Sequence, residues 1–154
     1  MALGFVLGMV AWAEPQVGKQ RAIAELAAAG LSWDDGKRAI AVTDDGRMKL
    51  KDLRAVERAL RELQPRSIDL SSCAALEKVD GVRGLRSLEA IFLTDCAALK
   101  NVDGVAGSDR LRKIYLFESM NVATESLEEL QRRFPKSYIV LPDGTGLNPP
   151  RKKD

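Results

Sequence analysis

A repeat of 23 residues occupies the middle of the chain and restricts the fold more than any other feature of the sequence. Segments 70–82 and 93–105 are identical at 9 of 13 positions when one is shifted onto the other by 23 residues. The same shift superimposes Ile68, Ile91 and Ile114, so a third and more divergent unit follows the first two. A fixed period of this length is typical of chains in which similar units stack and share one continuous core.

Two further apolar segments extend the series of units at either end. Segment 139–141 begins 25 residues after Ile114, and segment 40–42 begins 28 residues before Ile68. Isoleucine or leucine at every second position of a short strand points to one side of it. On that side, each unit buries these side chains against the next unit. The sequence therefore predicts about four units, with turns or 3₁₀ segments at the Val-Asp-Gly-Val connectors in the middle of the chain.

The longer connectors carry signals of helices. Asp52 is placed to cap a helix over residues 53–63, and Ser126 has the spacing of a capping box ahead of Leu130. Asp80 and Asp103 occupy the same position in neighbouring units, and we expect them to accept hydrogen bonds from backbone amides of their own turns.

Segments 88–96 and 111–119 follow the pattern L-x-x-L-x-L-x-x-N/C, with cysteine or serine at the last position. On these segments the chain resembles leucine-rich repeat proteins, and Cys96 makes it most similar to their cysteine-containing subclasses. The order of the elements also resembles short secreted repeat proteins of environmental bacteria. The resemblance implies an α/β fold, a leucine-rich-repeat solenoid of about four coils with parallel strands on its concave face. Pro65 and Lys136 replace the first template leucine, so we expect imperfect outer units.

The two end units need cover, because an open terminal unit exposes its apolar face. We predict that residues 14–38 form a cap made of an amphipathic helix over 15–29 and a hairpin that turns at 34–37. The repeat domain then spans residues 39–142. The polar, proline-rich and glycine-rich residues 143–154 are predicted to be a disordered tail.

Residues 1–13 form an uncharged apolar run that ends in Ala11-Trp12-Ala13. This pattern indicates a signal peptide that is cleaved before Glu14, although the basic start of such signals is missing. The run is too short to span a bilayer. The prediction is a secreted or periplasmic protein; in the alternative, the segment is retained as a strand or helix packed on the core, and the protein is cytoplasmic.

Composition excludes several classes of function. The chain has no histidine, which removes Ser-His-Asp and Cys-His catalysis and HExxH zinc sites. Its 24 Lys and Arg against 22 Asp and Glu leave a net charge of +2, too small to indicate a nucleic-acid partner. We expect no catalytic residues, no metal and no cofactor.

Cys73 and Cys96 are the two thiols and occupy the same template position in neighbouring units. Their backbones should lie one strand spacing apart, about 4.8 Å. Packing as a structural ladder of small buried thiols is the favoured interpretation. A disulfide between them is the alternative, since this spacing permits one.

If the isoleucines point inward, the residues between them form columns on the opposite side of the sheet. Four aromatic residues gather in these columns with charged residues beside them, and we predict a binding face made of Phe92, Tyr115, Phe117, Tyr138, Lys113, Arg112, Asp95 and Glu118. Exposed aromatics with a charged rim are typical of protein-binding surfaces. The alternative is structural: the rings stack across strands, or the C-terminal tail covers them.

The predicted function is therefore a non-catalytic leucine-rich-repeat module that binds a protein of unknown identity through its concave strand face. We expect no nucleic-acid partner and no membrane span. The competing hypothesis is an intracellular subunit with a retained N-terminus, similar to substrate adaptors of ubiquitin ligases or assembly factors of membrane complexes.

Overall fold

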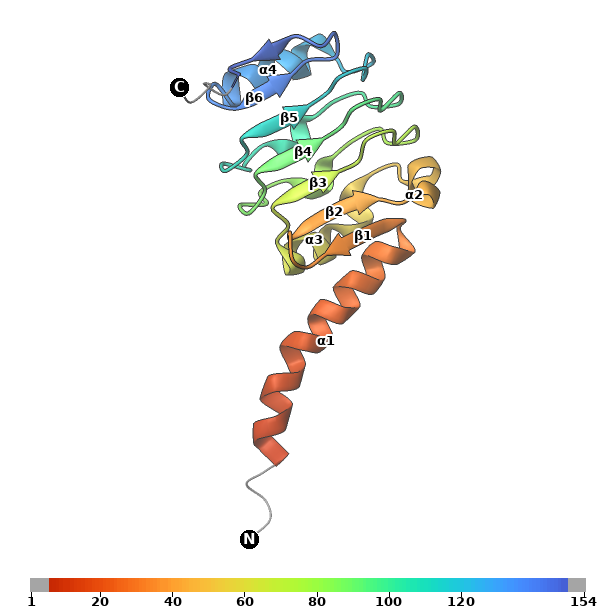
Figure 1. The fold of residues 1–154 in the computed structure, drawn as a ribbon, viewed down its shortest axis with the longest axis vertical. Coiled ribbons are helices and arrows are strands. Elements are labelled where there is room, and N and C mark those ends of the chain that lie inside the picture. The colour runs from red at the N-terminus through yellow and green to blue at the C-terminus, as the bar shows by residue number, and fades with distance from the viewer. Residues whose placement is uncertain (1–5, 150–154) are drawn as a thin grey trace.

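A computed structural model describes residues 6–149, with side chains from residue 15 onward, and shows an α/β fold with one open sheet of seven strands (Figure 1). The strands are β1 (Leu31–Asp34), β2 (Ala39–Val42), β3 (Ser67–Asp69), β4 (Ala90–Phe92), β5 (Lys113–Tyr115), β6 (Tyr138–Val140) and β7 (Gly146–Leu147). They follow one another across the sheet in sequence order. Neighbours from β2 to β6 pair in parallel, whereas β1 and β7 pair antiparallel at the two edges.

An isoleucine ladder runs through the five parallel strands. Ile40, Ile68, Ile91, Ile114 and Ile139 are register partners from strand to strand, and each is at most 1% exposed. The predicted alignment of the three central isoleucines is confirmed. Because side chains alternate along a strand, the residues beside each isoleucine belong to the opposite face of the sheet.

The connections between parallel strands pass behind the sheet and carry the described helices except the first, which precedes the sheet (Figure 1). These helices include three short 3₁₀ segments, among them the two that the Val-Asp-Gly-Val connectors predicted. The helices are α1 (Val6–Ala28), α2 (Asp44–Lys49), η1 (Leu53–Val56), α3 (Glu57–Leu63), η2 (Asp80–Val82), η3 (Asp103–Val105) and α4 (Thr124–Arg133), where η marks a 3₁₀ helix.

The 3₁₀ segments stack so closely that two positions require glycine. A Cβ atom on Gly81 would lie closer than 3.0 Å to the carbonyl group of Leu53, and one on Gly104 closer than 3.0 Å to that of Val79. The valines on either side of each glycine are buried in the core. The repeated Val-Asp-Gly-Val motif therefore combines two core side chains with the one residue that lets successive connections touch.

The front end of the sheet is covered by α1 and by the β1–β2 hairpin, which the sequence predicted. Ala22 and Leu26 of α1 are fully buried, and Glu25 forms an ion pair with Arg58 of α3. The first half of α1 projects away from the sheet (Figure 1).

The predicted start of this helix was wrong, because α1 begins at Val6 and holds Pro15 inside it. Proline favours a first turn, but the Leu, Met, Val and Ala residues before Pro15 continue the helix upstream. Residues 1–5 of the predicted signal peptide lie outside the described part of the chain. Among helices within residues 6–149, none has the length and apolar character needed to cross a membrane.

The C-terminal end of the sheet differs from what the sequence predicted. Residues 143–149 are not a disordered tail, since they form a turn and strand β7, which pairs with β6. Asp143 accepts a hydrogen bond from the amide of Thr145 at 2.9 Å, and Gly144 has a φ of +87° that suits the turn. Leu147 then packs against the core. The turn residues had the composition of disorder, but they close a hairpin; residues 150–154 lie outside the described range.

Candidate binding face

The side of the sheet opposite the isoleucine ladder, here called the strand face, carries the columns that the repeat predicted. Ser67 pairs with Ala90, Ala90 with Lys113 and Lys113 with Tyr138. The second column consists of Asp69, Phe92, Tyr115 and Val140 in register.

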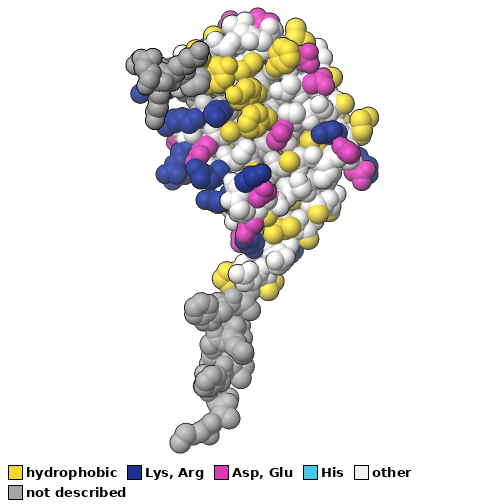
Figure 2. Space-filling model, viewed as in Figure 1, with side chains coloured by type: hydrophobic (Ala, Val, Ile, Leu, Met, Phe, Trp, Pro, Cys, Tyr) yellow, Lys and Arg dark blue, Asp and Glu magenta, His cyan; other side chains and the backbone are white. Residues whose placement is uncertain are grey.

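Three aromatic rings of this face, Phe92, Tyr115 and Tyr138, form what we call the aromatic column. The Phe92 and Tyr115 rings stack nearly in parallel, with centroids 4.9 Å apart and planes at 18°, and the Tyr115 and Tyr138 rings meet edge to face at 5.7 Å. All three side chains are half-buried, and Phe117 beside them is 42% exposed. Figure 2 shows apolar side chains gathered in the upper half of this face, over β4 to β6. The rings therefore stack on each other and still present apolar surface to solvent.

The C-terminal hairpin packs against one end of the aromatic column. A Cβ atom on Gly146 would lie 3.2 Å from the Tyr138 ring, and one on Gly144 would lie 3.3 Å from the Phe117 ring. These two glycines therefore allow the hairpin to approach the rings closely. Phe92 and Tyr115, which lie farther from β7 in the sheet, are the part of the column that this hairpin leaves uncovered.

A hollow of about 370 Å³ adjoins the other end of the column, in front of β1 to β3. Its floor is formed by the small side chains of Ala39, Ala41 and Ser67, with Asp69 and Phe92 on its wall. In the second column β2 carries Ala41 where β4 and β5 carry the rings of Phe92 and Tyr115, and the smaller side chain leaves room for the hollow.

Positive side chains line the edge of the face where the parallel strands begin. This basic edge consists of Arg38, Arg66, Arg110, Arg112 and Lys113, all exposed. Arg66 donates two hydrogen bonds to Glu89, at 3.1 and 2.9 Å. These bonds hold the pKa of Glu89 below its usual value, and the charges of Arg66, Arg110 and Arg38 lower it further. In Figure 2, Lys and Arg side chains gather along the left side of the molecule.

Acidic side chains lie at the opposite edge, where the parallel strands end. This acidic edge consists of Asp69, Asp95, Glu118 and Asp143, all exposed. Asp95 and Glu118 occupy equivalent turns with φ of 55° and 62°, a region in which aspartate is among the better tolerated residues. Their backbone amides donate to the carbonyls of Phe117 and Pro142 on the next turn. The strand face is thus aromatic in its centre, basic along one edge and acidic along the other.

Cys73 and Cys96 lie behind this face, fully buried and with both thiols free. The Cys96 thiol donates to the Leu70 carbonyl at 3.3 Å. Burial is the main cause that raises the pKa of Cys73 to about 12 and that of Cys96 to about 11. Both groups are therefore protonated thiols at neutral pH, which is the state expected of packing residues.

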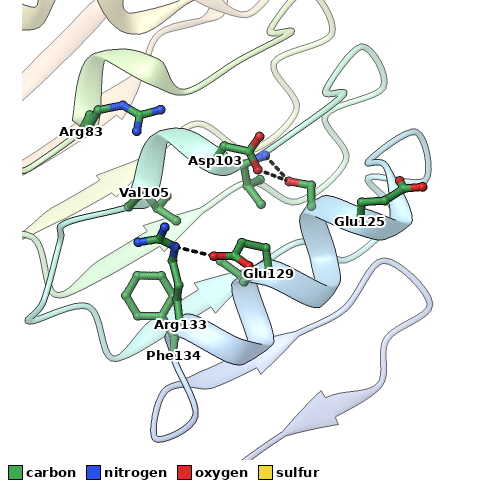
Figure 3. A pocket seen from close by; sticks show the side chains of 11 residues that line it. Arg83, Asp103, Val105, Glu125, Glu129, Arg133 and Phe134 are labelled. Atoms are coloured by element: carbon green, nitrogen blue, oxygen red, sulfur yellow. Dashed lines mark hydrogen bonds and ion pairs between the residues drawn. The ribbon is translucent and has the colours of Figure 1, made fainter.

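A second hollow, of about 270 Å³, lies on the other side of the molecule between η3 and α4 (Figure 3). Two of the lining side chains are engaged by neighbours: Arg133 donates to Glu129 at 2.8 Å, and Asp103 accepts from the hydroxyl of Ser126 at 2.7 Å. The same hydroxyl accepts from the amide of Val102 at 3.0 Å. The contacts of Ser126 join α4 to η3, whereas the bond between Arg133 and Glu129 lies within α4.

The contacts at Ser126 correct two predictions. Ser126 does not cap α4, whose N-cap is Ala123, because its hydroxyl is turned toward η3 instead. Asp103 and Asp80 do not accept from their own turns either. Asp103 accepts from Ser126, and Asp80 accepts from Arg54 at 3.2 Å. Each aspartate therefore links neighbouring connections.

The structure places all eight residues predicted for the binding face on the strand face or its edges. Sequence reasoning missed the contribution of Arg38, Arg110 and the hollow at Ala39 and Ala41. The signal was available for Arg38, which precedes β2 as Arg66 precedes β3. Comparisons of the chain with models of protein families, with curated protein sequences and with solved structures gave no match.

Proposed function

We propose that the chain is a leucine-rich-repeat solenoid of about four coils that binds a protein through its strand face and has no catalytic activity. The solenoid is supported by the isoleucine ladder, by strands that follow one another in sequence order and by the stacked 3₁₀ connections. The LxxLxLxxN/C pattern in segments 88–96 and 111–119 agrees with the same architecture.

The observation that carries the binding proposal is the aromatic column. Phe92 and Tyr115 are half-buried on the strand face, and the exposed ring of Phe117 adjoins them. Aromatic anchors with a polar rim dominate the energetics of protein interfaces, whereas single scattered apolar residues do not form such a group. Charged edges on both sides of the rings supply that rim.

A non-catalytic role is supported by the chemistry that the chain lacks and by the state of its thiols. The sequence contains no histidine. Burial holds the pKa of Cys96 at about 11, so the thiolate that a cysteine nucleophile needs is scarce at neutral pH. We propose no cofactor and no metal for this function.

We further propose that the protein is exported, as secreted or periplasmic, on the pattern of residues 1–13. N-terminal sequencing of the protein purified from its source cells tests this directly. A mature chain that begins at Glu14 supports export. A chain that retains Met1 refutes it and favours the intracellular adaptor or assembly subunit.

The binding proposal is tested by photo-crosslinking from the face itself. Tyr115 is replaced by benzoylphenylalanine, the protein is irradiated with material from its source, and crosslinked proteins are identified by mass spectrometry. The matched control carries the same group at Met48, which is 71% exposed on α2.

A partner identified from position 115 and absent from position 48 should lose binding to the F92A/Y115A variant. Circular dichroism checks that this variant stays folded. Unchanged binding of the identified partner to F92A/Y115A, with M48A as the control, would refute the assigned face.

A further inference from the structure

The charges at the two edges of the strand face are largely unpaired. Among residues 15–149, Arg66 forms an ion pair, whereas Arg38, Arg110, Arg112 and Lys113 form none. Most other cations in the same part of the chain are paired, as Arg54 is with Asp80. The four acids of the acidic edge likewise have no cationic partner within the described side chains. Unpaired charges of opposite sign therefore face solvent on either side of the aromatic column.

The size of the face limits what can occupy it. Five parallel strands at a spacing of about 4.8 Å span about 19 Å, and three residues at about 3.3 Å each give a width of about 10 Å. The resulting area of about 200 Å² is far below the roughly 800 Å² per partner of a stable protein dimer. An extended segment of about six residues, by contrast, has a length of about 20 Å. The face therefore suits a peptide segment better than a second copy of this chain.

The arrangement of positive and negative side chains on the strand face distinguishes between the extended polymers that could bind there. A nucleic acid is negative along its whole length and would be repelled at Asp69, Asp95 and Glu118. An extended polypeptide points successive side chains to opposite sides. When it lies along the aromatic column, alternate side chains reach the basic edge and those between them reach the acidic edge.

On these grounds, and resting on the proposed function, we propose that the partner contributes an extended segment of about six residues with Asp or Glu at every second position. The segment crosses β2 to β5 over Phe92 and Tyr115, the part of the aromatic column that the C-terminal hairpin leaves uncovered. Its acidic side chains contact Arg112, Lys113 and Arg38, and neutral or basic side chains between them face the acidic edge. An apolar side chain near one end fills the hollow over Ala39 and Ala41.

A displayed library of random dodecapeptides, selected on the intact protein, tests this inference. Enriched peptides are synthesised with a fluorescent label, and their affinities are measured by polarisation. We expect Asp or Glu at i and i+2 in the enriched sequences. Affinity should fall about tenfold or more in R112E/K113E, because like charges then meet, and should also fall at higher salt.

The matched control is K49E/K51E, which makes the same charge change at two exposed lysines, the last residue of α2 and a residue just after it. Binding to this control should stay within about twofold of the original protein, since these lysines are not part of the strand face. Circular dichroism confirms that both variants are folded.

The possible results distinguish a failure of this inference from a failure of the proposed binding face. Peptides that need Phe92 and Tyr115 but show no acidic preference, or that tolerate R112E/K113E, overturn this inference and leave the proposed function intact. Peptides that bind F92A/Y115A unchanged contradict the proposed face itself. A selection that enriches no peptide, or tighter binding of a labelled oligothymidylate than of any peptide, also overturns the inference.

Discussion

The inward position that ends each repeat template is held by Cys73, Cys96 and Ser119, and their hydrogen bonds differ. The hydroxyl of Ser119 donates to the Leu93 carbonyl at 2.5 Å and accepts from the Cys96 amide at 2.9 Å. The Cys96 thiol makes the equivalent donation, to Leu70 at 3.3 Å. Serine is tolerated in this apolar core because both of its bonding functions are satisfied.

Replacing Ser119 by alanine should lower the free energy of unfolding by about 1–3 kcal/mol, because the Cys96 amide and the Leu93 carbonyl lose their partner in the core. Urea denaturation followed by circular dichroism measures the change. Ser119→Cys is the matched control, since a thiol at this position can repeat the bond that Cys96 makes, and it should cost less than alanine. Equal losses for the two variants would contradict the assigned role of the hydroxyl.

The buried thiols should not react in the folded protein. With pKa values of about 12 and 11, Cys73 and Cys96 provide at pH 8 no more than about one thiolate in a thousand. We expect Ellman's reagent to label neither thiol in buffer and both in 6 M guanidinium chloride. Rapid labelling of one thiol under native conditions would show that it is reachable and reopen a chemical role.

The same raised pKa values predict that stability falls in alkaline solution. The folded state keeps both thiols protonated above the ordinary pKa of 9.0, whereas the unfolded chain releases these protons. The unfolding free energy contributed by the thiols is therefore complete below about pH 9 and is lost as the pH rises through the folded-state pKa values of about 11 and about 12. Denaturation curves at several pH values should show a flatter decline for C73A/C96A than for the unchanged chain.

Among the secondary-structure elements, the 3₁₀ connections have no room for a single added methyl group at their glycines. Gly104→Ala should destabilise the protein by several kcal/mol, about 3 or more, because its Cβ meets the backbone of Val79 and neither backbone can withdraw. Gly84→Ala is the control: its Cβ would meet nothing within 4 Å, but its φ of +73° costs about 1 kcal/mol. Thermal unfolding compares the two. A larger loss at Gly84 than at Gly104 would contradict the stacking of the connections.

The sequence predicted elements well where the repeat is regular and less well outside it. The 23-residue period identified β3, β4 and β5 and their register, because the isoleucine spacing determines which face each residue joins. Ser126 was misassigned because a serine three residues before a glutamate also fits a role in tertiary contacts. Whether Asp143 and Gly144 begin a tail or a hairpin depends on β6 offering a free edge, which no local pattern records.

The binding face was predictable to a similar extent. Periodicity alone placed Phe92, Tyr115 and Tyr138 in neighbouring strands, since each precedes or follows a buried isoleucine. The packing of Gly146 under Tyr138 and the hollow in front of β2 depend on side-chain sizes in several strands at once. Such features appear only when the strands are assembled.

At the scale of the whole molecule, the seven-stranded sheet has different cover at its two ends. Leu26 of α1 is fully buried at the front end, and Phe134, after α4, is 8% exposed at the back end. The proposed solenoid implies that inner units contact mainly their neighbours, so a defect at one end should weaken that end first. This behaviour differs from that of a globular core, in which a single truncation lowers the protection of all elements together.

Leu26→Ala and Phe134→Ala form a matched pair that tests this arrangement. Each should cost about 2–5 kcal/mol, because a large buried side chain is lost without collapse of the site. Hydrogen exchange followed by mass spectrometry should show faster exchange in β1, β2 and α3 for Leu26→Ala, and in α4 and β6 for Phe134→Ala. Strands β3 to β5 should keep the slowest exchange in both variants, since each has a parallel neighbour on either side. An equal rise across all strands in both variants would mean that the chain unfolds as one unit, and the two ends would then have no independent stability.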